Sequence, residues 1–419
     1  MRVFVLFSFF LTTSLVAQPI KVEIQKTENG FQLLREGKAY FIKGAGGISF
    51  LNEAKEAGAN SVRTWHYDDK ASLLDEAHRL GLTVCLGFWV RPERQGMDYN
   101  DEKAVKAQFE RFKEAVLKFK DHPALLCWAI GNEVDLNYKN TRVWNAIQDL
   151  AKMIHDLDPN HPTTTVIAGI KRDVVHQIKT KCPDIDMLGV NVYGDIENVP
   201  KKVRDYGWEK PYFIGEWSST GHWEVPKTKW GAPIEQSSTE RAKLARTRYA
   251  NSIAKDSAQC VGGYVFIWGQ KQERTPTWYG VFTEAKEKTE MVDVMTEIWT
   301  GKKATNTAPK LSSFKIDGKR APDNITLKPN HPYLATFSAS DDENDALQPR
   351  WEILPESTDL KEGGDREARP ETLNGLIQTQ TPNSATFLSP QKRGAYRLFL
   401  YVADGNGAVA TENIPFFVE

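Results

Sequence analysis

Between residues 39 and 300 the chain alternates short apolar runs with longer amphipathic stretches. The apolar runs have the length of buried strands, and we expect strands at Ala39–Gly44, Ser61–His66, Thr83–Val90, Leu125–Asn132, Thr163–Ala168, Met187–Tyr193, Tyr212–Trp217 and Gly263–Trp268. The helical spacing of apolar residues is clearest at Lys70–Leu80, Glu102–Phe119, Thr141–Leu157 and Thr239–Lys255. This alternation predicts a parallel sheet covered by helices.

The number of expected strands distinguishes between two α/β folds. Eight strands that alternate with helices over roughly 250 residues are typical of a closed (β/α)₈ TIM barrel. An open, doubly wound sheet usually carries a glycine-rich phosphate loop after its first strand. The segment Lys43–Gly47 is rich in glycine but does not fit the G-x-G-x-x-G pattern. We therefore predict an α/β fold with a (β/α)₈ TIM barrel over residues 43–302.

Smaller β-structures are expected on both sides of the barrel. Residues 18–42 alternate and turn at Glu28–Gly30, which predicts an N-terminal β-hairpin. Residues 303–308 are small and polar and indicate a linker. Residues 309–419 show no clear helical pattern, and their short alternating runs predict a small all-β immunoglobulin-like sandwich. Its strands are expected at Tyr333–Ala339, Gln348–Ile353, Ser384–Leu388, Tyr396–Ala403 and Asn413–Val418.

An acidic run, Asp341–Asp345, lies between two of these strands. Clustered carboxylate oxygens suit calcium, but the spacing does not fit an EF-hand loop. A solvated acidic turn is the alternative, and we favour it.

No CxxC or histidine-rich cluster predicts a zinc site. We therefore expect no metal and no cofactor.

The first residues of the chain are typical of an export signal. Arg2 precedes the apolar run Val3–Leu11, and Ser14–Ala17 ends in a small residue, as cleavage sites do. We predict a signal peptide over residues 1–17 and a periplasmic or secreted protein. The run is short for a membrane span, and an uncleaved anchor is the alternative. We expect no membrane insertion after cleavage, because no other run is long enough to cross a bilayer.

Composition restricts the partners further. The net charge of −1 gives no electrostatic reason to expect nucleic acid or an anionic membrane as a partner. Aromatic residues make up 11% of the chain, and such rings either line sugar-binding clefts or, more often, pack cores. Of the four cysteines, Cys85 and Cys127 lie inside apolar runs, where free buried thiols are expected.

Two glutamates stand at the ends of two apolar runs. Glu133 follows Leu125–Asn132, and Glu216 follows Tyr212–Gly215. The carboxyl ends of barrel strands build the active site, so both carboxylates are expected at one rim. Retaining glycoside hydrolysis requires two carboxylates about 5–5.5 Å apart, one as acid/base and one as nucleophile. The chain carries no G-x-S-x-G elbow, P-loop or H-E-x-x-H zinc pair that would indicate another chemistry.

Four segments in order resemble one group of enzymes. Gly131-Asn132-Glu133 and Gly215-Glu216-Trp217 are similar to the fourth- and seventh-strand signatures of clan A glycoside hydrolases, which are retaining (β/α)₈-barrel enzymes. Gly58–Tyr67, which reads GANSVRTWHY, resembles the second-strand segment of glycoside hydrolase family 2, and Phe41–Gly44 resembles its first strand. Val134 stands where family 2 commonly has proline, and Asn-Glu-Val is instead similar to β-1,3-glucan-active families of the clan.

The resemblance implies a role for each matching residue. Glu133 would be the general acid/base, which needs a raised pKa, towards ~6. Glu216 would be the nucleophile, with Arg63 as the cation that keeps it ionised. Asn132 would hydrogen-bond the sugar 2-hydroxyl, a contact that strengthens in the transition state. Tyr193 would donate a hydrogen bond to the nucleophile.

Rings and polar groups near the expected strand ends complete the candidate site. Trp268 matches a position where the clan often places a ring against the scissile sugar, and His66 resembles a family 2 histidine that frames the sugar. Further rings cluster at expected strand ends or in the following loops: Trp65, Trp89, Trp217, Trp223 and Trp278. Some of them are expected to line the cleft, with Trp217 and Trp89 as the candidates for substrate binding, although core packing is the alternative for such rings. The polar loop Gln270–Trp278 follows the last strand and is expected either to contact substrate or to be a solvated surface loop.

We therefore expect a retaining β-glycoside hydrolase that acts on a β-glucan or β-linked oligosaccharide, with a β-1,3-linked glucan as the first substrate hypothesis. A β-glucan transglycosylase would use the same residues, and an exo-acting β-galactosidase or β-glucuronidase is a further alternative. A non-catalytic carbohydrate-binding protein is the alternative from another class. The partner in each case is a polysaccharide or oligosaccharide, and the sequence does not indicate an oligomeric state.

Overall fold

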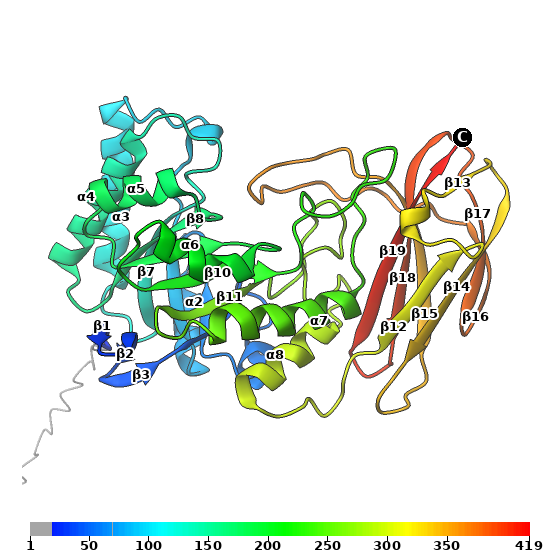
Figure 1. The fold of residues 1–419 in the computed structure, drawn as a ribbon, viewed down its shortest axis with the longest axis horizontal. Helices are drawn as coiled ribbons and strands as arrows, with labels where there is room; N and C mark the ends of the chain where they lie inside the picture. The colour runs from blue at the N-terminus through cyan, green and yellow to red at the C-terminus, as the bar shows by residue number, and fades with distance from the viewer. Residues whose placement is uncertain (1–18, 69) are drawn as a thin grey trace, which may run out of the picture.

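The computed structural model describes residues 19–68 and 70–419, so the predicted signal peptide lies outside the described part of the chain. Figure 1 shows a barrel surrounded by helices and, beside it, a second domain made of strands. Helix α7 (Ser238–Arg248) contacts strands of the second domain. None of the helices in the described ranges combines the length and the hydropathy needed to cross a bilayer.

The first domain is a closed barrel of parallel strands within the described residues, in the order β4-β5-β6-β7-β8-β9-β10-β11, with β11 pairing back to β4. Its strands are β4 Ile42–Gly46, β5 Ser61–Arg63, β6 Thr83–Phe88, β7 Leu125–Asn132, β8 Thr163–Ala168, β9 Met187–Asn191, β10 Tyr212–Ser218 and β11 Cys260–Phe266. Helices cover the outer face while side chains fill the interior, so nearly every strand residue is buried. The predicted (β/α)₈ TIM barrel is confirmed.

The remaining helices are α1 Leu51–Glu56, α2 Ala71–Arg79, α3 Glu102–Phe119, α4 Arg142–Leu157, α5 Arg172–Lys181, α6 Val199–Asp205 and α8 Glu290–Thr300, with short 3₁₀ helices at Glu93–Gln95, Ile196–Asn198 and Ala321–Asp323. Local sequence sets several ends. The Asp101 side chain accepts hydrogen bonds from two free N–H groups at the start of α3, and Gly301 ends α8 with φ 74°. The helix expected at Thr239–Lys255 changes to a π-helix at Tyr249–Ala254.

A three-stranded sheet closes the amino-terminal end of the barrel. It consists of β1 Val22–Thr27, β2 Gly30–Arg35 and β3 Lys38–Tyr40, so the expected hairpin gains a third strand. Val22 and Leu33 pack in one apolar cluster with the barrel residues Leu126 and Phe213. A Cβ atom at Gly30 would lie 1.9 Å from the carbonyl oxygen of Ala258, so only glycine fits this contact. The opposite, carboxyl end of the barrel is therefore the end available for a site.

The C-terminal domain packs two four-stranded sheets, counted over the described residues, around its own apolar core. Their orders are β12-β14-β17-β16 and β13-β19-β18-β15. The strands are β12 Lys310–Ile316, β13 Thr326–Leu327, β14 Pro332–Ser340, β15 Gln348–Pro355, β16 Ile377–Thr381, β17 Ser384–Leu388, β18 Gly394–Ala403 and β19 Val409–Val418. The predicted all-β domain after the barrel is confirmed.

The acidic run folds around its first carboxylate. Oδ1 of Asp341 accepts hydrogen bonds from the backbone N–H groups of Glu343 and Asp345, at 3.0 and 2.9 Å. Asp341, Asp345 and Asp404 each bring one carboxylate oxygen within 4.8 Å of the others.

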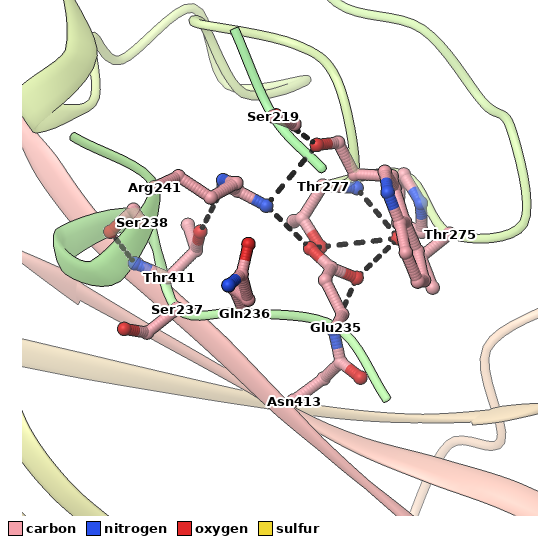
Figure 2. A network of polar contacts seen from close by, with 12 residues as sticks. Ser219, Glu235, Gln236, Ser237, Ser238, Arg241, Thr275, Thr277, Thr411 and Asn413 are labelled. Atoms are coloured by element: carbon pink, nitrogen blue, oxygen red, sulfur yellow. Dashed lines mark hydrogen bonds and ion pairs between the residues drawn. The ribbon is translucent and has the colours of Figure 1, made fainter. Parts of the chain in front are cut away.

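A buried carboxylate joins the two domains, as Figure 2 shows. Glu235 accepts hydrogen bonds from Arg241 of α7 at 2.7 Å and from Asn413 of β19 at 2.6 Å. It also accepts hydrogen bonds from Thr275 and Thr277, in the loop after β11, at 2.6 and 2.8 Å. The Glu235 side chain is 2% exposed, and both of its oxygens are fully partnered. This network fixes the loop after β11 against the C-terminal domain.

We expect Glu235→Ala to destabilise the folded chain by about 3–5 kcal/mol, because it leaves the buried Arg241 guanidinium without its counter-charge. Thermal unfolding followed by circular dichroism measures the loss. The double variant Glu235→Leu with Arg241→Met removes both charges and should be less destabilised than the single variant. A single variant as stable as the unsubstituted chain would contradict this interpretation of the network.

Candidate active site

A cavity of about 640 Å³ opens at the carboxyl ends of the barrel strands. Both Glu133, after β7, and Glu216, in β10, line it, so the two glutamates face one space. The segment Lys361–Gly364 of the C-terminal domain also lines the cavity. The size and the mixture of aromatic and polar lining residues are typical of a small-molecule or oligosaccharide site.

The backbone at the end of β7 turns Glu133 into the cavity. Strand pairing with β8 is irregular between Ala129 and Asn132, and Gly131 and Glu133 both have positive φ, 83° and 49°. A left-handed conformation is uncommon for a residue other than glycine and is often found at functional sites. The Glu133 N–H donates to the carbonyl oxygen of Val166 at 2.8 Å, which holds the turn against β8.

Glu133 lies in surroundings that favour its protonated form. Burial, followed by the nearby Glu216 carboxylate, raises the pKa of Glu133 to about 8. The hydrogen bond from Asn191 Nδ2 to Glu133 Oε1, at 2.9 Å, opposes this rise without cancelling it. The pKa lies further above the ordinary value than the ~6 anticipated from the sequence. At neutral pH Glu133 therefore carries a proton that it can donate.

Three donors converge on the Glu216 carboxylate. Arg63 Nη1 and Trp65 Nε1 donate to Oε1, at 3.2 and 2.7 Å, and the Tyr193 hydroxyl donates to Oε2 at 2.8 Å. Burial and the Glu216 charge raise the pKa of Tyr193, so its hydroxyl keeps the proton it donates. Arg63 is only 1% exposed, and a buried cation at this distance stabilises negative charge on Glu216.

Asn132 and Asn191 connect the two glutamates. The Asn132 side-chain oxygen accepts hydrogen bonds from Arg63 Nη2 at 2.6 Å and from Asn191 Nδ2 at 3.1 Å. Because this oxygen is held by two donors, the orientation of the Asn132 amide is fixed. Its nitrogen remains to donate to a group in the cavity, which Asn132 lines.

The structure brings most of the sequence-predicted residues together. Glu133, Glu216, Arg63, Asn132 and Tyr193 form one connected set of hydrogen bonds. Trp89 lines the cavity as well, and its Nε1 donates to Gln95 at 3.0 Å.

Three predicted substrate-binding residues do not line the cavity. His66 follows the end of β5 and is an exposed residue near Asp68. Trp217 directly follows Glu216 in a strand, so its side chain points to the opposite, helix-covered face. Trp268 is buried outside the cavity, where its Nε1 donates to the Phe50 carbonyl oxygen.

The structure also adds residues that the sequence did not single out for these roles. Trp65 donates to Glu216, and Phe266, the last residue of β11, takes a place in the cavity wall where a ring at Trp268 was expected. Glu273 from the loop after β11 adds a third buried carboxylate, whose pKa is raised by burial. Trp65 was among the rings expected near the cleft, and its hydrogen bond to Glu216 fits its place two residues after Arg63 on the same side of an extended chain.

Comparison with known proteins identifies the domain. Residues 50–223 match the family described as glycosyl hydrolases family 2, TIM barrel domain. The matched segment contains the barrel strands β5 to β10 and is similar to the TIM barrel domain of glycoside hydrolase family 2, a family of retaining enzymes. The resemblance seen in the sequence motifs to family 2 is confirmed.

Each individual relative aligns with only part of this chain. A β-glucuronidase of Streptococcus agalactiae is 25% identical over 231 residues, which are 45% of this chain and 37% of that protein. A β-galactosidase of Bacteroides ovatus is 25% identical over 218 residues, 43% of this chain and 24% of that protein. The chain thus spans well under half the length of these relatives. The structure of a Bacteroides uniformis β-glucuronidase is similar with a TM-score of 0.53 and 15% identity, covering 95% of this chain and 48% of that one, which shows likeness of fold.

Proposed function

We propose that this protein is a retaining β-glycoside hydrolase that works by double displacement. The observation that carries the proposal is that two glutamates in one cavity have opposite surroundings, one favouring the protonated carboxyl and the other the carboxylate. Glu133 has a pKa raised to about 8, while Glu216 accepts hydrogen bonds from Arg63, Trp65 and Tyr193. An acid that holds a proton beside a carboxylate that holds a charge is the arrangement that retaining hydrolysis requires.

In the first step, a Glu216 oxygen attacks the anomeric carbon while Glu133 transfers its proton to the glycosidic oxygen. The bond to the leaving group breaks, and a glycosyl ester of Glu216 forms. Asn132 is placed to donate to the sugar 2-hydroxyl, because its own oxygen is held by Arg63 and Asn191.

In the second step, Glu133 acts as a base. The Glu216 charge is one cause of the raised Glu133 pKa, and that charge is absent once Glu216 is esterified. The pKa of Glu133 then falls, so the carboxylate can take a proton from the incoming water. Water attacks the anomeric carbon, and the sugar leaves with its original configuration. A second sugar in place of water would give transglycosylation by the same residues.

The comparisons favour one substrate class. Both curated relatives described above are named as a β-glucuronidase or a β-galactosidase. An exo-acting β-galactosidase or β-glucuronidase is therefore the substrate hypothesis with most support. The cationic side chains Lys271, Arg274 and Lys361, each paired with a carboxylate, line the cavity and are the groups that would bind an acidic sugar.

A β-glucan or β-linked oligosaccharide remains the second candidate, because the aromatic lining extends to the rim of the cavity. Trp65, Trp89 and Phe266 line the interior, and Trp223 is 56% exposed. An exposed ring at a cavity mouth provides a stacking surface for a further sugar unit. We also propose a periplasmic or secreted location, which rests on the pattern of residues 1–17 alone.

The proposal is tested by incubating the full chain with nitrophenyl β-glucoside, β-galactoside and β-glucuronide, and with soluble β-glucans. Release of nitrophenol or of reducing sugars identifies the sugar, and nuclear magnetic resonance of the first product reports its anomeric configuration. Retained configuration is expected, and an inverted product would contradict the double displacement.

We expect Tyr193→Phe to lower kcat by roughly tenfold to a hundredfold while KM changes little, because a hydrogen bond to the charged Glu216 is lost without changing the shape of the cavity. Steady-state kinetics on the substrate found in the assay above measure this effect. An unchanged kcat would remove Tyr193 from the catalytic machinery.

A further inference from the structure

A long loop of the C-terminal domain reaches the active site. It connects β15, which ends at Pro355, to β16, which begins at Ile377. Figure 1 shows this loop extending from the sandwich towards the barrel. Its residues Lys361–Gly364 line the same cavity as Glu133 and Glu216.

Polar contacts fasten the loop to the barrel on one side of the cavity. Asp365 accepts hydrogen bonds from Arg94 Nη1 and Gln95 Nε2, both at 2.9 Å, and Arg94 is almost buried in this contact. Glu362 accepts a hydrogen bond from Asn137, after β7, at 2.8 Å. The loop is thus held by residues that follow the barrel strands β6 and β7.

The same loop is also held by the polar segment after β11. Lys271 Nζ donates to the Gly364 carbonyl oxygen at 2.9 Å. Glu367 is almost fully buried and accepts a hydrogen bond from the Arg274 N–H at 2.6 Å, with a 3.2 Å ion pair to the Arg274 side chain. The loop therefore bridges strand ends on two sides of the barrel mouth.

The loop sequence suits this close approach. Gly363 and Gly364 both have positive φ, 61° and 73°, a conformation that favours glycine. A Cβ atom at Gly363 would lie 2.6 Å from Arg94 Nη2. The positive φ values, together with the close Arg94 side chain, therefore favour glycine at this point of the loop.

One hydrogen-bonded path connects the loop to a ring of the cavity. Trp89 donates to Gln95 Oε1 at 3.0 Å, and Gln95 donates to Asp365 Oδ1 at 2.9 Å. The loop thereby fixes Gln95, and Gln95 fixes the indole nitrogen of Trp89. A flat ring together with polar groups of a neighbouring wall is what a pyranose unit requires, since its C–H face stacks and its hydroxyls hydrogen-bond.

We propose that Lys361–Gly364 form an interdomain subsite that binds a sugar unit of a β-linked oligosaccharide beyond the unit that Glu216 attacks. This inference rests on the proposed function and deepens it. The C-terminal domain is then part of the substrate-binding cleft. Asp365 is a positioning residue, because it lies outside the cavity and acts through Arg94 and Gln95.

The test compares the Asp365→Ala variant with the unsubstituted chain on nitrophenyl glycosides of one, two and three β-linked units, whose terminal sugar is the one identified in the assay above. Asp342→Ala is the matched control, because Asp342 is an acidic residue whose ion pair, with Lys310, lies within the C-terminal domain. For Asp365→Ala we expect KM to rise roughly tenfold on the longest substrate, with less than about a threefold change on the monosaccharide. Equal effects on all lengths, no effect, or better use of the longest substrate would overturn the subsite.

A binding measurement separates this inference from the proposed function. Isothermal titration calorimetry of cello- and laminari-oligosaccharides with Glu216→Gln, alone and combined with Asp365→Ala, needs no turnover. Weaker binding of the longer sugars to the double variant supports the subsite even if no glycoside is hydrolysed. Equal binding to both variants, or binding to neither, overturns it. If circular dichroism shows that Asp365→Ala does not fold, Lys361→Ala is measured in its place. Lys361 pairs with Asp359 of the same loop, so this substitution does not remove an ion pair between the loop and the barrel.

Discussion

Glu216→Ala is expected to lose roughly 10⁴-fold or more in kcat, because the variant lacks the carboxylate that forms the glycosyl ester. The three donors Arg63, Trp65 and Tyr193 would remain, but they would face an empty position. Added azide can enter that position and attack the anomeric carbon from the same side as Glu216. It should restore part of the activity on aryl glycosides and give a glycosyl azide of inverted configuration.

The matched control is Glu297→Ala, which removes a glutamate on helix α8 that pairs with Arg246, and neither residue lines the cavity. This variant should keep its activity within about twofold, as surface substitutions usually do. If Glu216→Ala keeps a near-normal rate, or if azide produces a glycosyl azide of retained configuration, Glu216 is not the nucleophile.

Glu133→Gln is expected to lose about 10²- to 10⁴-fold on substrates with poor leaving groups, because the leaving oxygen no longer receives a proton. On aryl glycosides with strongly activated leaving groups the first step needs little protonation. The variant should therefore form the glycosyl-enzyme quickly and hydrolyse it slowly, since the base for the second step is also lost. Stopped-flow measurement of nitrophenol should show a burst, and equal losses on both kinds of substrate would contradict the role of Glu133.

The pH dependence gives an independent test of the same residue. Glu133 donates its proton only below its own pKa, which burial and Glu216 raise to about 8. For the unsubstituted chain, kcat/KM on a poor leaving group should therefore fall as the pH rises through about 8. This falling limb should be missing in Glu133→Gln. A profile that already falls near pH 5 would mean that Glu133 has an ordinary pKa.

The catalytic residues could be predicted from sequence because their positions follow from topology. The carboxyl ends of parallel barrel strands lie at the barrel mouth, so the apolar runs before Glu133 and Glu216 placed both residues at that end before any contact was known. Arg63 and Tyr193 required the family resemblance as well. Arg63 pairs with Glu216 from 153 positions away, and Tyr193 donates its hydrogen bond from the end of another strand, so neither contact leaves a local pattern.

The rings were harder to place, because hydrophobic periodicity does not distinguish a cavity wall from a core. Trp217 lies in a strand that is buried on both faces, and only alternation from Glu216 assigns it to the outer one. Near the end of β11 the sequence contains two aromatic candidates for the cavity wall, Phe266 and Trp268. The residue at which the strand ends determines which of them lines the cavity. β11 ends at Phe266, and Trp268 is then buried against Phe282 and Trp299.

The sequence allowed a packing or substrate-positioning role for the C-terminal domain, but the contacts by which the domain reaches the cavity could not be predicted. The contacts of Asp365 with Arg94 and Gln95 join residues about 270 positions apart. In the sequence, Lys361–Gly364 reads as a polar turn between strands. Only the packing of two domains turns it into a wall of the active site.

The most direct test of the central claim is to trap the covalent intermediate. Fluorosugar β-glycosides of glucose, galactose and glucuronic acid with an activated aryl leaving group form the glycosyl ester faster than it is hydrolysed. Intact-mass spectrometry followed by peptide mapping should find one sugar on the peptide that contains Glu216, and none in Glu216→Ala. A sugar attached to another residue, or steady turnover of ordinary substrates with no labelled peptide, would contradict the account.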